Sequence, residues 1–282
     1  IRLGKDLLTL LTDHRVDEVN STTNYTVKER KVQGVAASYA LKRDGWDALA
    51  TVRHDRNSQF GSFTNWALSG GYLLNDQFRL VGSVGTTFQA PSFNQLYWPS
   101  FGNAALKPQR GKAQEIGLRY QQGSTQASAT VYRNEVEGFI TPATNVQSNL
   151  AVLSGVTLSV DQSWGATKLS ASYDYADPRL KPANQRVTRV ARNVLRTQVN
   201  QQYGAWNTFA EVRLSSNRED TQFPGRVTLP GYGLINLGTA YKVNKQWSVQ
   251  TRLNNLANKS YSLANGYTTP GRNVFVSLHW ND

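Results

Sequence analysis

The sequence predicts an all-β protein, specifically a transmembrane antiparallel up-and-down β-barrel. Segments of about ten residues alternate between apolar and polar side chains along the whole chain, and this period of two indicates β-strands. Short and long connectors follow one another in turn, which is the rhythm of a meander with one smooth end and one ornate end. No stretch shows a convincing helical period.

The alternation can be followed element by element. Between 78 and 89, every second residue from Phe78 to Phe88 faces one side, and the residues between them face the other. The same pattern recurs at 126–131, 210–215, 235–243, 247–254 and 274–280. Counting all such segments predicts about 14 strands.

The connectors support this count. Short turns, several with the Asx-Gly chemistry of tight hairpins, are expected at 44–45, 75–76, 122–123, 164–165, 203–204 and 244–245. Longer polar connectors are expected at 16–28, 57–62, 91–111, 137–148, 179–186, 219–230 and 259–270. Each strand is therefore expected to pair with the next one along the chain.

Strand length favours a membrane barrel over a soluble sandwich, whose strands average roughly 5–6 residues. Segments of about ten residues suit a tilted strand that crosses a bilayer. The polar side of the segments carries Gln, Arg, Asn, Glu and Lys, which a protein core would not accept. Aromatic residues near segment ends, such as Trp46 and Trp280, suit an interfacial girdle, although a large soluble β-domain remains an alternative.

Composition excludes several classes of protein. The chain has no cysteine, so it can form neither disulfides nor thiolate metal sites. Its net charge of +12 is scattered, which argues against nucleic acid as a partner and suits an anionic membrane surface. The first residues lack the features of a signal peptide, and we expect them to be the cut end of a longer protein.

Enzyme signals are weak, and we expect no catalytic residues and no resident cofactor. The three histidines, His14, His54 and His279, are far apart in sequence. Glu135 and Glu137 share one face of a strand and are interpreted as solvated charge. The acidic pairs at 17–18 and 219–220 supply too few oxygens for calcium, so no metal is expected.

Several motifs resemble one family. "LNNLANKSY", then "GYTTPGR" and a closing alternating strand, resemble the C-terminal end of the TonB-dependent outer-membrane receptors. "GTTFQAPSFNQLY" followed by "NAALKPQRGKAQEIGLRY" resembles the central barrel of that family, although Gln109 stands where Glu is usual. Within the family, "RHDRNSQFGSFTNWALSGGY" and "APSFNQLYWPSFGN" are most similar to the vitamin B12 (cobalamin) receptors.

The resemblance implies a 22-stranded barrel in the bacterial outer membrane, preceded by a plug domain with a TonB box. Residues 1–282 would be the C-terminal portion of the barrel, with the plug and the first strands absent. The implied function is active import of cobalamin or a related corrinoid into the periplasm, driven by the TonB complex through the plug. Outer-membrane lipid and lipopolysaccharide would surround the barrel. A receptor for ferric siderophores and a non-transport β-rich surface binding protein remain alternatives.

Six residues are candidates for ligand binding. The loop "PSFNQLYWPSFGN" offers Gln95, Tyr97 and Phe101 as a hydrogen-bonding side chain and aromatic surfaces, with packing between loops as the alternative. The resemblance implies that Arg189 and Tyr267 lie near the ligand, although Arg189 could equally be a charge in the wall of the lumen. Phe223, in another long loop, is the sixth candidate.

Overall fold

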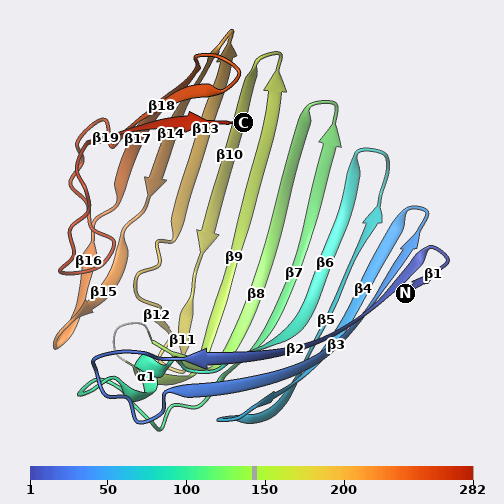
Figure 1. Cartoon of the computed structure of the whole chain (residues 1–282), viewed down its shortest axis with the longest axis vertical. Coiled ribbons are helices and arrows are strands. Elements are labelled where there is room, and N and C mark those ends of the chain that lie inside the picture. Colours follow the sequence, from blue (N-terminus) through green and yellow to red (C-terminus); the bar gives the residue numbers. More distant parts are fainter. Residues whose placement is uncertain (142–144, 282) are drawn as a thin grey trace. The chain divides into compact units, whose positions relative to one another are not determined.

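The computed structural model describes residues 1–141 and 145–281, which form antiparallel β-structure almost throughout (Figure 1). The chain divides into two compact units. Unit 1 consists of Ile1–Leu118, Val131–Ser154 and Pro178–Arg186, and unit 2 of Arg119–Thr130, Gly155–Asp177 and Val187–Asp282. Strands β7 (Gln109–Gln122), β8 (Thr125–Ile140) and β9 (Gln147–Trp164) contribute residues to both units.

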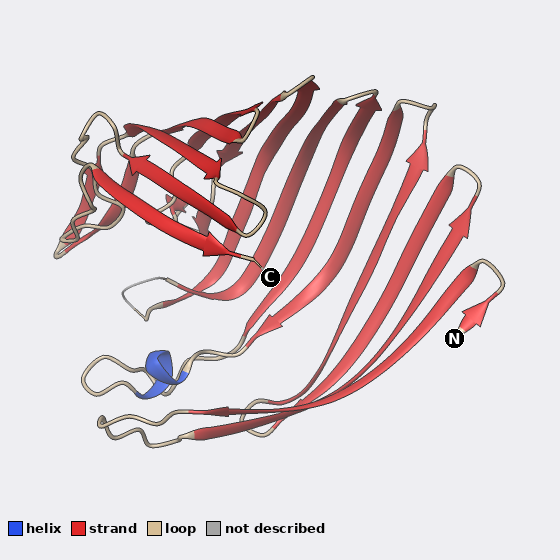
Figure 2. Ribbon diagram, turned by 45° about the horizontal axis from the view of Figure 1, so that its top comes forward, coloured by secondary structure: helices blue, strands red, loops and turns tan. Residues whose placement is uncertain are grey.

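Unit 1 is built on consecutive antiparallel strands, with β2 pairing β3, β3 pairing β4, β4 pairing β5 and β5 pairing β6. Its other elements are short pieces and one helix, α1, which is coloured blue in Figure 2. The bounds are β1 (Arg2–Leu3), β2 (Asp6–Glu18), β3 (Glu29–Arg43), β4 (Trp46–Asn57), β5 (Gly61–Leu73), β6 (Phe78–Gln89), α1 (Phe93–Tyr97), β11 (Arg179–Lys181) and β12 (Gln185–Arg186).

Unit 2 continues the meander, because β10 pairs both β9 and β13, and the later long strands pair in chain order. A separate two-stranded hairpin, β15–β16, lies in the connector between β14 and β17. The bounds are β10 (Thr167–Ala176), β13 (Asn193–Tyr203), β14 (Trp206–Ser215), β15 (Arg218–Gln222), β16 (Gly225–Leu229), β17 (Tyr232–Lys242), β18 (Trp247–Asn254) and β19 (Asn273–Trp280).

The strand count and the up-and-down order are confirmed. In the described part of the chain, fourteen strands have eight residues or more, and the other five have five or fewer. The prediction of a long connector at 57–62 was wrong. Strands β4 and β5 extend into this range, so only residues 58–60 separate them. The connector expected at 137–148 shortens to 141–146 because β8 and β9 extend into it, and residues 142–144 lie outside the described residues.

The apolar face of the strands is exposed, as the predicted barrel requires. On β19, Val274, Val276 and Leu278 are each at least 60% exposed. On β4 and β5, Val52 and Trp66 are opposite each other and both are exposed. An apolar surface of this size is unfavourable in water and needs an apolar cover. In a membrane barrel, lipid provides that cover.

Aromatic pairs gather beside the short turns, which confirms the predicted concentration of aromatic residues near segment ends. Trp206 and Tyr241 face each other across β14 and β17 with ring centroids 4.5 Å apart. Trp247 and Trp280 are paired across β18 and β19 at 6.5 Å. Aromatic rings at the ends of membrane-spanning strands suit the boundary between lipid and water.

None of the helices formed by residues 1–141 and 145–281 is both long enough and apolar enough to span a membrane.

The other face of the strands carries charge, and the charges are paired. In unit 2, the Arg252 guanidinium donates to Glu211 at 2.8 Å and Arg196 donates to Asp174 at 2.6 Å. In unit 1, the same face presents Arg53, which contacts two carboxylates. The predicted separation of an apolar face from a polar face therefore holds in both units.

Candidate functional site

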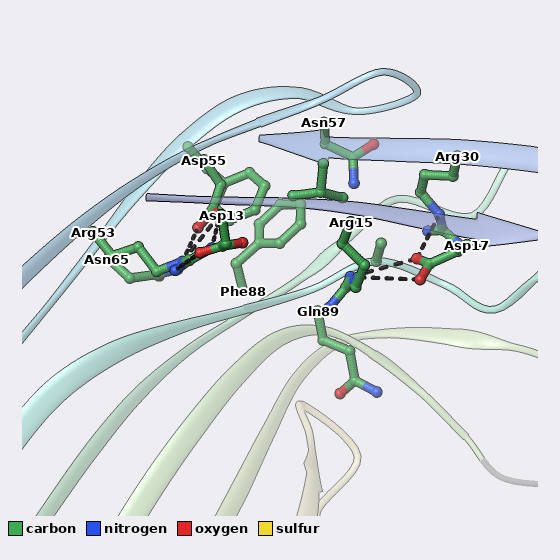
Figure 3. A pocket seen from close by; sticks show the side chains of 13 residues that line it. Asp13, Arg15, Asp17, Arg30, Arg53, Asp55, Asn57, Asn65, Phe88 and Gln89 are labelled. Atoms are coloured by element: carbon green, nitrogen blue, oxygen red, sulfur yellow. Dashed lines mark hydrogen bonds and ion pairs between the residues drawn. The ribbon is translucent and has the colours of Figure 1, made fainter. Parts of the chain in front are cut away.

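A pocket of about 490 Å³ lies in unit 1, where the polar face of β2–β6 approaches the long connectors (Figure 3). Most of its lining residues are charged, amide-bearing or aromatic. They are Asp13, Arg15, Asp17, Arg30, Val32, Arg53, Asp55, Asn57, Phe63, Asn65, Phe88, Gln89 and Ala90.

Arg53 is the central cation of this pocket. Its Nη1 and Nη2 donate to the two carboxylate oxygens of Asp13 at 2.7 and 3.0 Å, and its Nε donates to Asp55 at 2.9 Å. Asp55 is only 4% exposed, so its charge depends on this partner. The guanidinium can lie across β3 because Gly34 has no side chain: a Cβ there would collide with Arg53 Nη2.

A second charged group shares the pocket. Arg15 Nε lies 3.1 Å from Asp17, and Arg30 Nε lies 3.8 Å from the same carboxylate. Arg30 Nη1 also donates to the Pro91 carbonyl at 3.0 Å, and its guanidinium lies 4.8 Å from the centre of the Phe93 ring. The pocket thus contains three aspartates and three arginines, each with an ion-pair partner inside it, so its lining has no net charge.

An aromatic pair completes the pocket and corrects the predicted alternation of β6. Phe63 and Phe88 are stacked with ring centroids 3.5 Å apart. The paired register of β5 and β6 ends at Ala67 opposite Gly85, and the Thr86 hydroxyl accepts the Trp66 amide instead. This local break turns Phe88 to the pocket side, so its predicted place on the apolar face with Phe78 was wrong.

The helix α1 and its flanking loop, which follow the pocket residues Gln89 and Ala90 in the chain, contain three of the predicted ligand residues. The side chain of Gln95 accepts the Ser92 amide at 2.9 Å, which completes a capping box at the start of α1. Tyr97 packs against a small core formed by Leu96, Leu106 and Ile140, and its hydroxyl contacts Gln59. Phe101 is 49% exposed. The structure therefore gives Gln95 and Tyr97 local packing partners and leaves the Phe101 ring open.

A hydrogen bond joins this loop to the connector between β2 and β3. The Tyr25 hydroxyl donates to Asn94 Oδ1 at 2.6 Å, and the Tyr25 ring meets Trp98 edge-on at 6.2 Å. Tyr25 is only 5% exposed, although it lies in a surface connector. The two connectors are therefore held together by one buried phenol.

Replacing Tyr25 by phenylalanine should loosen the 19–28 and 90–108 connectors while leaving the strands intact. The variant keeps the ring but loses a hydrogen bond worth about 1 kcal/mol, which corresponds to a roughly fivefold greater population of the open loops. Limited proteolysis of the membrane-embedded protein would measure this as faster cleavage in these connectors. Tyr203→Phe, at an exposed short turn, is the matched control. Equal cleavage rates for the wild type and Tyr25→Phe would contradict the expectation.

The other three predicted residues lie on long connectors of unit 2 that Asp220 joins. Arg189 Nε donates to both oxygens of Asp220, at 2.9 and 3.1 Å, and the Arg189 amide donates to the Glu219 carbonyl at 2.7 Å. Asp220 also accepts the Asn265 amide at 2.6 Å. Asn265 lies two residues before Tyr267, so one carboxylate connects the segments that carry both residues.

Tyr267 and Phe223 present exposed rings on these segments. Tyr267 is 71% exposed, and its carbonyl accepts the Ser262 hydroxyl at 2.8 Å. Phe223 is fully exposed at the end of the β15–β16 hairpin, directly after Gln222. The structure thus brings Arg189, Phe223 and Tyr267 into one loop cluster, while Gln95, Tyr97 and Phe101 belong to unit 1.

Asp220 remains ionised because its hydrogen bonds outweigh its burial. Burial alone would raise the pKa of this carboxyl, but the Asn265 and Thr221 amides and the Arg189 guanidinium lower it below its ordinary value. The stabilisation that the carboxylate provides is therefore complete above about pH 4 and is lost only as the pH falls through its lowered pKa.

Two features of these sites did not emerge from the sequence. In the sequence, Asp220 is only half of an acidic pair too small for calcium, whereas in the structure it is the fully buried centre of the unit 2 loops. Arg53 and Asp55 lie on one face of a strand by their spacing, but the second partner of Arg53, Asp13, is contributed by β2, on the far side of β3. No local sequence pattern indicates such a partner.

Comparisons with known proteins agree with the β-barrel fold. The family model "TonB dependent receptor-like, beta-barrel" matches residues 7–256. The chain is 29% identical over 273 residues to the vitamin B12 transporter BtuB of Vibrio vulnificus, covering 92% of this chain and 44% of that protein. It is 27% identical over 276 residues to BtuB of Photobacterium profundum, covering 93% and 45%. The chain therefore spans less than half the length of these curated relatives.

Solved structures resemble it in fold. The siderophore receptor PirA from Acinetobacter baumannii superposes with a TM-score of 0.82 at 19% identity, covering 98% of this chain and 52% of that one. The copper transporter OprC gives a TM-score of 0.82 at 16% identity, with 99% and 55% covered. At these identities the likeness concerns the fold of the barrel.

Proposed function

The chain belongs to the TonB-dependent receptor β-barrel family of the outer membrane, and from this we propose that it binds cobalamin or a related corrinoid for import into the periplasm. The whole transporter would draw its energy from the TonB complex, acting through a plug domain. In this proposal the chain is the ligand-binding and membrane-spanning part of a transporter and catalyses no reaction. Both BtuB relatives carry the name of vitamin B12 transporters, which supports this choice of ligand.

The observation that carries the proposal is the neutral lining of the pocket in unit 1. A corrinoid is a large ligand with many amide side chains and no strong net charge. It suits paired charges, amides and a stacked aromatic pair, which offer hydrogen bonds and apolar surface without an excess of either sign. A catecholate ferric chelate is a polyanion, and the arginines here are already neutralised by aspartates.

The exposed rings of the loops support the same ligand class. Phe101 in unit 1 and Phe223 and Tyr267 in unit 2 are all about half exposed or more, although the loops that carry them are held by internal hydrogen bonds. Open aromatic surfaces on ordered loops are typical of sites that await a large ligand with apolar faces. We therefore propose each of these rings, within its own unit, as a candidate contact surface for a corrinoid.

Equilibrium binding of cyanocobalamin to the full-length receptor in detergent tests the proposal. We expect saturable binding that a ferric catecholate siderophore does not displace, because the lining offers no unpaired cation for it. Tyr267→Ala and Arg189→Ala should each weaken binding about tenfold, which corresponds to about 1.4 kcal/mol.

Tyr203→Ala is the control for these variants, since Tyr203 is an equally exposed tyrosine beside a short turn. It should bind cyanocobalamin like the wild type. A folded receptor that does not bind cobalamin, or that releases it to the siderophore, would remove the corrinoid and make the ferric chelate the better candidate.

A further inference from the structure

Asp220 is the most completely enclosed carboxylate among the described residues of unit 2. Its side chain is 0% exposed, yet it lies in a short surface hairpin and not in a core of packed strands. Its Oδ1 accepts from the Thr221 amide at 2.8 Å and from Arg189 Nε at 2.9 Å. Its Oδ2 accepts from the Asn265 amide at 2.6 Å and from Arg189 Nε at 3.1 Å. A buried charge with this many donors is fixed in position.

The donors come from three separate segments. Thr221 belongs to the β15–β16 hairpin, Arg189 to the connector before β13, and Asn265 to the connector between β18 and β19. A second bond links Asn265 Nδ2 to the Thr221 carbonyl at 3.2 Å. The Asp220 carboxylate is therefore the junction of the long connectors of unit 2.

The contact with Asp220 also determines which hydrogen-bond donors of Arg189 remain available to a ligand. The residue has a φ of +66°, an uncommon backbone conformation for a side chain of this size, and its amide is held by the Glu219 carbonyl. Nε is occupied by Asp220, whereas Nη1 and Nη2 make no hydrogen bond to any residue within 1–141 and 145–281. The side chain is 34% exposed. The two NH₂ groups, with four N–H donors, thus remain free on a guanidinium whose charge is already neutralised.

We propose that Asp220 is a positioning residue for ligand binding, which locks the three connectors together and presents the Arg189 Nη donors to an oxygen acceptor of the ligand. The acceptor class is an uncharged amide carbonyl, because the neutralised guanidinium favours hydrogen bonding over charge attraction. The ligand part of this inference rests on the proposed function, whereas the locking of the connectors does not.

The locking is tested without ligand. Cysteines placed at the exposed positions Phe223 and Tyr267, in a full-length receptor without other cysteines, accept a pair of spin labels at defined sites. Electron paramagnetic resonance on the full-length receptor should give one narrow distance distribution. Asp220→Asn should broaden it, since an amide cannot accept from donors on both sides.

Two further variants make the result specific. Glu219→Gln removes the neighbouring carboxylate, whose partner Arg226 lies in the same hairpin, and should leave the distribution narrow. Arg189→Met removes the guanidinium without touching Asp220 and should broaden the distribution, which provides a second route if Asp220→Asn does not fold. An unchanged distribution in a folded Asp220→Asn or Arg189→Met variant would overturn the proposal.

The role in binding is then measured on unlabelled protein. Asp220→Asn should weaken cyanocobalamin binding by about tenfold or more, while Glu219→Gln should change it less than about twofold. Unchanged affinity in Asp220→Asn would overturn the positioning role. If the wild type binds no cobalamin but Asp220→Asn still broadens the distance distribution, the proposed function fails while the locking of the connectors is upheld.

Discussion

Replacing Arg53 by methionine should lower the free energy of unfolding of the barrel by about 3 kcal/mol, the low end of the range for breaking a buried charge pair. The substitution keeps most of the volume of the side chain but leaves Asp55, which is 4% exposed, without its cation. Asp13 loses its partner as well, but its side chain is 39% exposed and can recover hydration. The buried Asp55 therefore determines most of the cost.

The measurement is urea-induced unfolding of the protein in detergent micelles, with the dependence of the free energy on urea concentration compared between variants. Arg79→Met is the matched control, because Arg79 is about as exposed as Arg53 but is paired with Asp47, whose side chain is 49% exposed against 6% for Asp55. An exposed ion pair contributes only about 0–1 kcal/mol, so this variant should unfold close to the wild type. Equal losses for Arg53→Met and Arg79→Met would show that burial of Asp55 does not set the cost.

How far the sequence predicts this cluster can be stated residue by residue. In a strand, a period of two puts Arg53 and Asp55 on one face and Val52 on the other, as they lie in β4. It cannot supply Asp13, because that contact requires the register of β2 against β3 and the absence of a side chain at Gly34 between them. Register depends on pairing across the sheet, and a single strand carries little of that information.

The loops show the same division between local and distant information. The capping box formed by Ser92 and Gln95 is a local pattern, and it gives the Gln95 side chain a structural role where the sequence predicts a ligand contact. Asp220 interacts with residues 31 and 45 positions away in the chain, Arg189 and Asn265, and nothing near it in the sequence marks it as buried. Alternation predicts strands and their faces well, whereas the contacts that organise a binding site come from segments that only the fold brings together.

Replacing Val52 by arginine should destabilise the membrane-embedded barrel by about 2–4 kcal/mol, the cost of a charge on the lipid face near the middle of the bilayer. Val52 lies at the middle of β4, is 48% exposed, and is paired with Ala37 on one side and Trp66 on the other. Both cross-strand partners are apolar or aromatic, so an arginine here finds no carboxylate opposite it and must reach along the strand toward the interface.

Thr51→Arg is the control that makes the Val52 result informative, because Thr51 is adjacent in sequence but points to the polar face. It is paired with Ser38 and Ala67, and Arg53 and Asp55 follow on the same side of β4. An arginine at 51 should therefore cost less than about 1 kcal/mol, since substitutions on the lumen side of a barrel are tolerated.

Unfolding in lipid vesicles separates the two variants. If water covered both faces of β4, the two variants would differ little in stability, because exposed substitutions usually change stability by about 0.5 kcal/mol or less. A difference of about 2 kcal/mol or more is the result expected when lipid covers one face of β4 and not the other. Equal stabilities for the two variants would contradict the assignment of Val52 to the lipid face.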